Sequence, residues 1–327
     1  MIITQTPVRI SFAGGGTDFR EFFLEEGGCV VSTAIDKYLY VIMKERYNAQ
    51  IRVAYTKAEA VDHPDQIEHE LVREALKVVG IYKGIEVITT ADIPSEGSGL
   101  GSSSSLTVGL LNAAYAYAGE AKGAGELARE ACAIEIDILK KPIGEQDQYI
   151  AAYGGFRMIE FGPQHETRVR PLALEEGVRQ ALQEDLMLFS TGRVRSANPI
   201  LAEQRRNIGR NAGALREMRA MACGMAAALT RGQLGEFAAL LRAGWRLKKT
   251  LSGRISSDEI DGAYEAACRA GALGGKIAGA GGGGHLVLYC PRARQEAVRS
   301  ALAPMLQIPF QFEPGGSRVI VNYNGKR

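Results

Sequence analysis

The sequence is poor in the residues that build metal clusters, disulfide frameworks and nucleic-acid-binding surfaces. Its 327 residues include only four histidines and five cysteines. The cysteines, at positions 29, 132, 223, 268 and 290, are odd in number and form no Cys-x-x-Cys pair, so we expect reduced thiols. The 39 basic and 37 acidic residues leave a formal net charge of +2, which is too small for binding a phosphate backbone by counterion release. We therefore expect no nucleic-acid partner.

Long apolar runs are also missing. The longest weakly polar stretch, 220–229, is about half of the ~20 residues that a membrane-spanning helix needs. Residues 1–7 contain no basic region followed by an apolar stretch, which a secretory signal would have. These absences predict no membrane association and a cytoplasmic location.

What is present is a mixture of strand and helix patterns in the first half of the chain. The length allows two domains of roughly 150 residues, each with its own core. Alternation with β-branched residues predicts strands over the first dozen residues and over 30–41, 51–55, 85–90, 155–161 and 167–172. Helical spacing predicts helices over 66–79, 106–118 and 127–139. A polar stretch at 175–184 then indicates a boundary near residue 180, which gives domains 1–180 and 181–327.

The second half is richer in helices. The patterns predict strands over 186–190, 285–290, 310–312 and 318–322, and helices over 199–229, 233–251, 258–270 and 292–303. Strands and helices that come in runs, rather than in strict alternation, favour an α+β class in which helices cover one face of mostly antiparallel sheets.

The most informative segment is glycine-rich and lies between a predicted strand and a predicted helix. It reads Pro-Ser-Glu-Gly-Ser-Gly-Leu-Gly-Ser-Ser-Ser-Ser over residues 94–105. Glycines let the backbone approach a ligand, and the start of a helix presents unpaired N–H groups and the positive end of its dipole. The segment therefore predicts an anion cradle. It is no Walker A loop, because no Gly-Lys-Ser/Thr closes it. The alternative is a flexible loop with a serine cap.

A second glycine-rich segment, residues 279–284, matches the pattern G-x-G-x-x-G literally. That pattern marks a dinucleotide site only where it follows a strand and opens a helix. Here it leads into the apolar run 285–290, which predicts a strand. The alternative is a glycine bulge that lets two backbones pack closely.

A third segment, residues 7–18, carries polar side chains on a strand that ends in glycines. Alternation brings Arg9 and Ser11 to one face, and the run Gly14–Gly16 then presents Thr17 and Asp18. Taken alone, this is a tight turn with a polar tip.

In this order and at these separations, the three segments resemble the motifs of the GHMP kinases, the superfamily named for galactokinase, homoserine kinase, mevalonate kinase and phosphomevalonate kinase. The resemblance implies a two-domain fold: an N-terminal domain with a left-handed β-α-β crossover and a C-terminal ferredoxin-like α+β domain, with the active site between them. It also implies ATP as phosphoryl donor and Mg²⁺ as cofactor. The form of residues 14–18, together with Gly-Trp-Arg-Leu-Lys-Lys-Thr-Leu-Ser at 244–252, is similar to bacterial D-glycero-D-manno-heptose 7-phosphate kinases.

The resemblance also implies roles for individual residues. Asp147 would be the catalytic carboxylate, held ionised by Arg9. Ser103 and Glu135 would hold Mg²⁺, with Ser102 as the alternative hydroxyl; from the residues alone, Glu130 and Asp137 on the same predicted helix are equal candidates for the carboxylate. The nucleotide would contact Pro94, Gly97, Gly99, Leu100, Gly101, Ser102, Ser103, Ser104, Gly281 and Gly282.

The resemblance also implies which residues form the acceptor site. Ser11, Gly16, Thr17 and Asp18 would bind sugar hydroxyls, since a carboxylate accepts hydrogen bonds from vicinal donors. A phosphorylated acceptor also needs cations, and the candidates are Arg193, Arg195, Lys248 and Lys249, each of which could instead be an ordinary surface residue. The expected partners are therefore ATP and a sugar phosphate, and a homodimer is possible.

The resemblance favours transfer of the γ-phosphate of ATP to the anomeric hydroxyl of heptose 7-phosphate, which gives the 1,7-bisphosphate. One alternative is a kinase on another alcohol, such as fucose, galactose, mevalonate or homoserine. Another is a catalytically silent regulator that binds sugar and nucleotide, although the presence of Asp147 and Glu135 argues against it. A dinucleotide oxidoreductase would rest on residues 279–284 alone.

Overall fold

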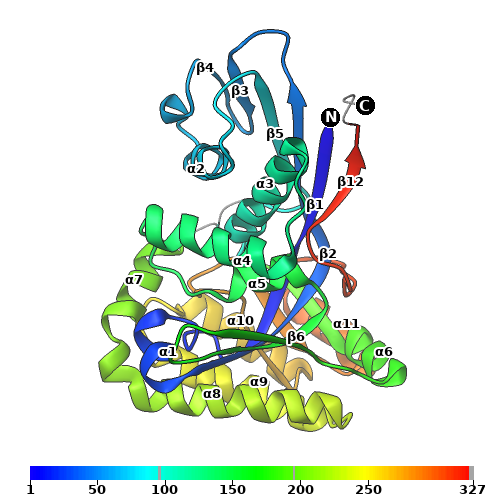
Figure 1. The fold of residues 1–327 in the computed structure, drawn as a ribbon. Helices are drawn as coiled ribbons and strands as arrows, with labels where there is room; N and C mark the ends of the chain where they lie inside the picture. The colour runs from blue at the N-terminus through cyan, green and yellow to red at the C-terminus, as the bar shows by residue number, and fades with distance from the viewer. Residues whose placement is uncertain (95–96, 194–195, 324–327) are drawn as a thin grey trace.

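The computed structural model describes residues 1–94, 97–193 and 196–323, which form two sheets with helices packed around them (Figure 1). The first sheet has eight strands and the second has four. Both are almost entirely antiparallel, as the α+β pattern predicted.

The first sheet is built on two long central strands. They are β1 (Ile2–Ala13) and β2 (Gly28–Glu45), paired antiparallel over most of the length of β1. The other members are β3 (Ile51–Ala54), β4 (Ala58–Val61), β5 (Ile85–Ala91), β6 (Phe156–Phe161), β7 (Thr167–Pro171) and β12 (Arg318–Asn322). The sheet forks on β2, which pairs with β6 along its first half and with β5 along its second half. Strands β3 and β5 are parallel.

The last strand returns to the first sheet. β12 pairs antiparallel with β1, from Ile2 opposite Asn322 to Gln5 opposite Arg318, so the red and blue ends of the chain lie together in Figure 1. The division into 1–180 and 181–327 stays a prediction. The pairing adds that the residues of β12 complete the sheet of the first half.

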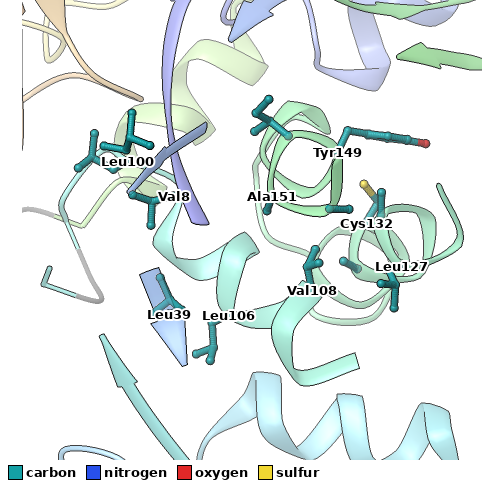
Figure 2. Close-up of a cluster of buried hydrophobic side chains, with 14 of the residues drawn as sticks. Val8, Leu39, Leu100, Leu106, Val108, Leu127, Cys132, Tyr149 and Ala151 are labelled. Atoms are coloured by element: carbon teal, nitrogen blue, oxygen red, sulfur yellow. The ribbon is translucent and has the colours of Figure 1, made fainter. Parts of the chain in front are cut away.

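Helices of the first half cover the central strands and form the main core. They are α1 (Arg20–Glu26), α2 (Glu70–Val79), α3 (Ser102–Ala118), α4 (Ala124–Cys132) and α5 (Gln146–Tyr153), with a 3₁₀ turn η1 (Pro64–Gln66) before α2. α3 packs against both β1 and β2. Figure 2 shows the cluster, in which Val8 of β1, Leu39 of β2, Val108 of α3 and Tyr149 of α5 are all buried. This core holds the ends of β1, α3 and α5 in fixed relation.

The second sheet has the ferredoxin-like arrangement that the resemblance implied. Its strands are β8 (Leu186–Ser190), β9 (Gly274–Ile277), β10 (His285–Tyr289) and β11 (Leu306–Gln307). They lie in the order β11-β8-β10-β9, which is 4-1-3-2 in chain order, and every pair is antiparallel. Helices separate the first strand from the second and the third from the fourth, which is the β-α-β-β-α-β pattern.

The helices of the second half connect the two sheets. They are α6 (Glu176–Asp185), α7 (Asn198–Arg206), α8 (Ile208–Thr230), α9 (Leu234–Lys249), α10 (Asp258–Ala270) and α11 (Gln295–Ala301), with a 3₁₀ turn η3 (Arg292–Arg294) before α11. α8 packs on β1 and β2, whereas α9 packs on β9 and β1. The end of β1 therefore lies between the two halves of the chain. Among the described helices, none is long and apolar enough to cross a membrane.

Several sequence-based expectations are corrected by the structure. The predicted helix 199–229 is two helices, because Asn207 between them adopts φ −97° and ψ 10°. The predicted helix 127–139 ends as an α-helix at Cys132 and continues as one π-helical turn, η2 (Ala133–Ile138). The polar stretch at 175–184 is mostly helix α6 rather than a linker.

The predicted strand 310–312 is also wrong. Only Phe312 pairs, as an isolated bridge to Ile35. The alternation there reflects ring packing, because the Phe310 and Phe312 rings contact each other with centroids 6.1 Å apart. The edge strand of the second sheet is β11, a few residues earlier.

Candidate active site

The predicted anion cradle is a loop of left-handed glycines that ends at the start of α3. Gly97, Gly99 and Gly101 have φ of 66°, 73° and 79°, a region that side chains disfavour. α3 begins directly after Gly101, so the free N–H groups of its first turn face the loop. The loop and the helix start line a cavity of about 330 Å³. This geometry suits an anionic ligand.

The second glycine-rich segment packs against the first. A Cβ added to Gly99 would lie 2.4 Å from the carbonyl oxygen of Ala278, and one added to Gly279 would lie 2.7 Å from the carbonyl oxygen of Gly99. The His285 ring also bonds the Ser98 carbonyl oxygen at 2.7 Å through Nδ1. Residues 279–284 therefore let two backbones approach, which was the alternative reading of this motif. Gly281 lines the cavity as well.

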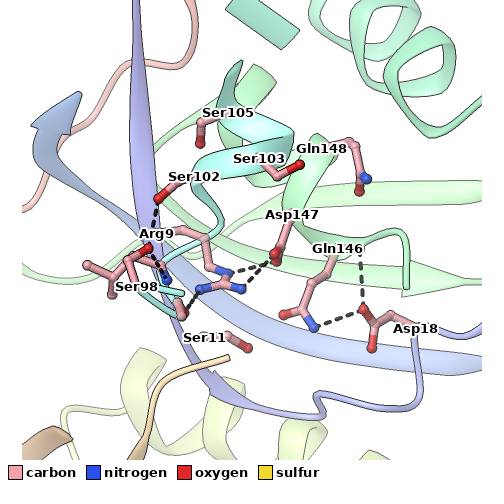
Figure 3. Close-up of polar contacts among 12 residues, drawn as sticks. Arg9, Ser11, Asp18, Ser98, Ser102, Ser103, Ser105, Gln146, Asp147 and Gln148 are labelled. Atoms are coloured by element: carbon pink, nitrogen blue, oxygen red, sulfur yellow. Dashed lines mark hydrogen bonds and ion pairs between the residues drawn. The ribbon is translucent and has the colours of Figure 1, made fainter. Parts of the chain in front are cut away.

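Arg9 and Asp147, which both line the cavity, form a bidentate ion pair (Figure 3). Arg9 Nε donates to Asp147 Oδ1 and a terminal nitrogen donates to Oδ2, both at 2.7 Å. The other terminal nitrogen donates to the Gly99 carbonyl oxygen at 2.6 Å. Arg9 is almost fully buried, whereas the carboxylate is 23% exposed on the cavity side. Arg9 thus ties Asp147 to the glycine loop through charge-assisted hydrogen bonds.

Asp147 lies on a helix that the sequence patterns did not predict. α5 begins at Gln146, so Asp147 is in its first turn. A negative charge there interacts favourably with the helix dipole. The helix also places Asp147 beside Gly101, where an added Cβ would lie 3.3 Å from Oδ2. The carboxylate is therefore held close to the start of α3.

Ser103 and Glu135 lie together, and they fit the requirements of a magnesium ion. Ser103 Oγ donates to Glu135 Oε2 at 2.9 Å, and Gln148 Nε2 donates to Oε1 at 3.0 Å. Glu135 is fully buried, and burial raises the pKa of its carboxyl, although the Lys141 ammonium 3.9 Å away acts in the opposite direction. Mg²⁺ prefers hard oxygen ligands and keeps several waters, so one hydroxyl and one carboxylate suffice.

The structure separates the alternatives for this pair. Ser102 Oγ is engaged with Ser98 Oγ at 2.7 Å, away from the carboxylate. Glu130 accepts from the Tyr115 hydroxyl, and Asp137 pairs with Arg20. Of these candidates in the described residues, Ser103 and Glu135 are the hydroxyl and the carboxylate that bond each other, and both line the cavity. No group of three or more histidine, cysteine, aspartate or glutamate side chains arranged for a metal occurs in the described part of the chain.

Asp18 forms a second buried carboxylate in the same cavity. Its side chain accepts from the Gly16 N–H at 2.7 Å and from Gln146 Nε2 at 2.9 Å (Figure 3). Burial raises the pKa of Asp18 despite these hydrogen bonds, and the nearby charge of Asp147 acts in the same direction. Ser11 and Gly16 also line the cavity, and Ser11 Oγ is buried without a hydrogen-bond partner.

Two buried lysines complete the cavity from the second half of the chain. Lys248 on α9 donates to the Gly15 carbonyl oxygen at 3.0 Å and to Gln204 Oε1 at 2.8 Å. Lys276 on β9 donates to the Ser11 carbonyl oxygen at 2.9 Å. Burial lowers the pKa of Lys248 to about 8 and that of Lys276 to about 7. Both ammonium groups favour an anionic ligand.

Other predicted site residues lie elsewhere. Thr17 is fully buried, and its hydroxyl bonds backbone atoms of Gly14 and Cys29 within the turn. Lys249 donates to Asp261 at 3.0 Å and faces a groove between α9 and α10. Arg193 pairs with Glu259 outside the cavity.

The remaining nucleotide candidates also differ in position. Ser104 lines the cavity, whereas Leu100 and Gly282 do not. Pro94 lines a neighbouring cavity of about 810 Å³, which shares Glu70, Ser103 and Lys141 with the first. Arg195 falls outside the described residues.

The polar residues of this site that sequence reasoning missed include Lys141, Gln146, Gln148 and Lys276. Gln146 and Gln148 belong to the site because they flank Asp147 on α5. The sequence patterns did not predict this helix. Lys276 had one available signal, a cation shortly before a glycine run. Lys141 follows the π-helical turn, and no sequence pattern indicated a place for it in the site.

Comparisons with known proteins agree with this geometry. The family model described as GHMP kinases N terminal domain matches residues 69–155, and the one described as GHMP kinases C terminal matches residues 225–305. D-glycero-alpha-D-manno-heptose 7-phosphate kinase of Campylobacter jejuni is 30% identical over 92% of this chain and 93% of its own length.

Two further relatives show the range of similar proteins. L-fucokinase/L-fucose-1-P guanylyltransferase of Bacteroides fragilis is 28% identical over 90% of this chain and 35% of its own length. A crystal structure described as a D-glycero-D-manno-heptose 1-phosphate kinase from Bacteriodes thetaiotaomicron superposes with a TM-score of 0.83 and 27% identity, covering 99% of this chain and 100% of that one. The family matches and the similarity along nearly the whole chain place this protein in the GHMP kinase family.

Proposed function

We propose that this kinase transfers the γ-phosphate of ATP to the anomeric hydroxyl of a sugar phosphate, with D-glycero-D-manno-heptose 7-phosphate as the substrate and the 1,7-bisphosphate as the product. The observation that carries the proposal is the Arg9–Asp147 pair, which holds a carboxylate on the cavity side beside the start of α3. A base at that point can meet both an acceptor hydroxyl and a bound phosphate chain. The name of the similar Campylobacter jejuni enzyme supports heptose 7-phosphate as the acceptor, and the description of the similar crystal structure, a heptose 1-phosphate kinase, supports only the class of heptose phosphates.

The triphosphate of ATP would lie along the glycine loop and the start of α3. The left-handed glycines free the backbone amides, and the helix N-terminus favours negative charge. The neighbouring cavity of about 810 Å³ opens next to Ser103 and is lined in part by Leu39, Tyr55 and Leu106. Its size and apolar side chains suit the adenosine end of the nucleotide.

Ser103 and Glu135 would hold Mg²⁺ at the phosphates, and the ion would neutralise charge on the phosphate oxygens. Gln148 holds the Glu135 carboxylate in place by its hydrogen bond to Oε1. Lys141 lies at the same wall, where its ammonium is 3.9 Å from Oε2 and 3.4 Å from Ser103 Oγ. Lys141 also pairs with Glu70 at 2.9 Å, so two carboxylates, the Ser103 hydroxyl and one cation lie at this end of the cavity.

Asp147 would accept the proton of the anomeric hydroxyl as the oxygen attacks. Arg9 fixes both oxygens of the carboxylate, so the base is positioned before the acceptor binds. Asp18 and Gln146 would bind other hydroxyls of the sugar. Gln146 Oε1 and Ser11 Oγ are buried and have no hydrogen-bond partner among the described residues, so each can form a hydrogen bond with the acceptor.

The charge in the cavity favours a phosphorylated acceptor over a neutral one. Lys248 and Lys276 are 5% and 7% exposed, and neither forms an ion pair with any carboxylate of the described residues. Buried charge without a partner is costly, and a phosphate compensates it. A neutral sugar such as fucose would leave at least one of these charges unmatched.

A substrate pair tests this proposal. Purified protein with ATP and Mg²⁺ is given heptose 7-phosphate or the same heptose without its phosphate, and ADP release is followed. We expect turnover with the phosphorylated sugar and at least a ~10-fold lower kcat/KM without the phosphate, since a charged hydrogen bond is worth about 1.5–3 kcal/mol. Equal rates would indicate a neutral-sugar kinase. ADP release no greater than that of the Asp147→Asn variant with either sugar would refute the proposal.

A further inference from the structure

We propose that Lys276 binds an oxygen of the phosphoryl group that is transferred, and so is a further catalytic residue of this site. The inference rests on the proposed function, because it requires a triphosphate along the glycine loop. Neither the three sequence motifs nor the roles implied by the resemblance include this lysine.

Lys276 is buried and lines the cavity. It lies on β9, which pairs with β10 through Lys276 opposite Val287. Its ammonium reaches across to β1, where it donates to the Ser11 carbonyl oxygen at 2.9 Å. Because Arg9 and Ser11 are two residues apart on one strand, their side chains share a face. Lys276 therefore approaches the Arg9–Asp147 pair from the opposite half of the chain.

A count of unused hydrogen-bond donors distinguishes Lys276 from Lys248, whereas an ion pair distinguishes it from Arg9, which is held by Asp147. Arg9 is already bonded to both Asp147 oxygens and to Gly99. Lys248 uses two donors, on Gly15 and Gln204. Lys276 uses one, on Ser11. An ammonium group has three donors, so Lys276 keeps two for a ligand and Lys248 keeps one.

The neighbours of the two lysines assign them to different parts of the substrates. Lys248 contacts Gly15 in the turn that carries Asp18, where the acceptor sugar is expected. β9, by contrast, leads through Ala278 directly to the contact between Gly279 and Gly99. Lys276 thus lines the same cavity as the base and the nucleotide loop, on the strand that leads to that loop contact. That is where the γ-phosphoryl group would pass from ATP to the acceptor.

The charges around Lys276 predict a characteristic pH dependence. Burial, Lys248 and Arg9 lower the pKa of the Lys276 ammonium to about 7, while Asp18 and Asp147 partly offset that effect. In the free protein the group therefore loses its proton as the pH rises through this value. A neutral amine cannot offer charge to the phosphoryl oxygens, so kcat/KM should fall above about pH 7. Bound ATP would raise the pKa and restore the charge.

Two substitutions separate charge from packing. Lys276→Arg keeps a cation at all accessible pH values, and Lys276→Met keeps the approximate volume without charge. We expect Lys276→Met to lower kcat about 10- to 100-fold with a smaller effect on the KM of the sugar. Lys276→Arg should retain more activity and lose the fall above pH 7. Lys44→Met, on β2 and ion-paired with Glu86 at the surface, is the matched control.

Calorimetry gives a readout that does not depend on turnover. Wild type, Lys276→Met and Lys44→Met are titrated with ADP and with a non-hydrolysable ATP analogue, each with Mg²⁺, at about pH 6.5. We expect Lys276→Met to bind the analogue about 10- to 100-fold more weakly than wild type and to bind ADP nearly unchanged, because only the analogue has a γ-phosphate. Lys44→Met should match wild type with both.

The outcomes distinguish this inference from the proposed function. If wild type binds both nucleotides and Lys276→Met binds the analogue as tightly as wild type does, the inference is wrong and the kinase proposal stands. If wild type binds neither nucleotide, the kinase proposal itself is refuted, and the inference with it. Should methionine unfold the protein, Lys276→Arg decides: a pH profile identical to that of wild type would overturn the role of Lys276.

Discussion

The two walls of the cavity differ in how their charges are satisfied. On the wall formed by β1, α3 and α5, Arg9 is paired with Asp147, and Glu135 is bonded by Ser103 and Gln148. On the wall formed by α9 and β9, the lysines are bonded only to backbone carbonyls and one amide oxygen. The first wall is complete without a ligand. The second wall holds positive charge that the described residues do not neutralise.

This difference assigns separate tasks to the two walls. A base and a metal site must have fixed geometry before the substrates arrive, and internal hydrogen bonds provide it. A wall that binds anions must instead keep its charges available, at a cost in stability that the ligand removes. We infer that the first wall positions the chemistry and the second wall selects and binds phosphate. The predictions below test each part of that division.

Loss of the base on the first wall should have the largest effect. We expect Asp147→Asn to lower kcat about 10²- to 10⁴-fold, because an amide cannot accept the hydroxyl proton and cannot pair with Arg9 as an anion. Steady-state rates measure the change, and circular dichroism checks that the fold is retained. A loss smaller than about 10-fold would mean that Asp147 is not the base.

Removing the carboxylate of the proposed metal site should have the next largest effect. We expect Glu135→Gln to raise the Mg²⁺ concentration needed for half-maximal rate by about 10- to 100-fold, because the ion loses its one anionic protein ligand. Titration of the rate with Mg²⁺ measures the shift. Glu130→Gln is the control, since Glu130 bonds Tyr115 and does not line the cavity. An unchanged Mg²⁺ requirement in Glu135→Gln would exclude this carboxylate as a ligand.

Two adjacent lysines test the second wall. Lys248→Met should raise the KM for the sugar phosphate about 10-fold or more, because it removes a buried cation beside Gly15. Lys249→Met should leave KM nearly unchanged, since Lys249 faces Asp261 in another groove, and its partly exposed ion pair is worth only about 0–1 kcal/mol of stability. Steady-state kinetics of both variants gives the two KM values for the sugar phosphate. Equal effects would mean that burial in the cavity does not determine phosphate binding.

The smallest expected effect is a change with pH in the free energy of unfolding, caused by the two buried lysines. The folded pKa values of Lys248 and Lys276, about 8 and about 7, lie below the ordinary value of 10.5, so the unfolded chain binds more protons between these limits. The contribution of these groups to the free energy of unfolding therefore rises with pH over that range. We expect Lys276→Met to be more stable than wild type near pH 6 and this advantage to shrink by about pH 9. Urea unfolding measures it, and a constant difference would contradict the lowered pKa.

Much of the fold could be predicted from local sequence patterns. The short elements that bring the second half of the chain to the site could not. The central strands, α3 and the order of the second sheet agree with the alternation and with the family resemblance. The position of Lys276 depends on β9, a strand of four residues that begins with two glycines and carries little pattern of its own. The lysine is 265 residues away from Ser11, its hydrogen-bond partner, so only tertiary pairing brings them together.

The first wall was easier to predict than the second for a physical reason. Its motifs are loops whose glycines and serines have one main use, to expose backbone amides at a helix start. The π-helical turn at Glu135 and the helix start at Gln146 were missed, because each depends on packing rather than on propensity. Lys248 and Lys249 have the same side chain in the same helix. Only the packing of α9 decides which of them is buried.

The most direct test of the central claim is phosphorus NMR of the reaction mixture. Wild-type protein, ATP, Mg²⁺ and D-glycero-D-manno-heptose 7-phosphate are incubated together, with Asp147→Asn in a parallel sample. The account predicts a new phosphate signal coupled to the anomeric proton, with the original 7-phosphate signal retained, in the wild-type sample only. A spectrum in which ATP is consumed while the anomeric position stays unphosphorylated, or in which both samples form the product equally, would contradict it.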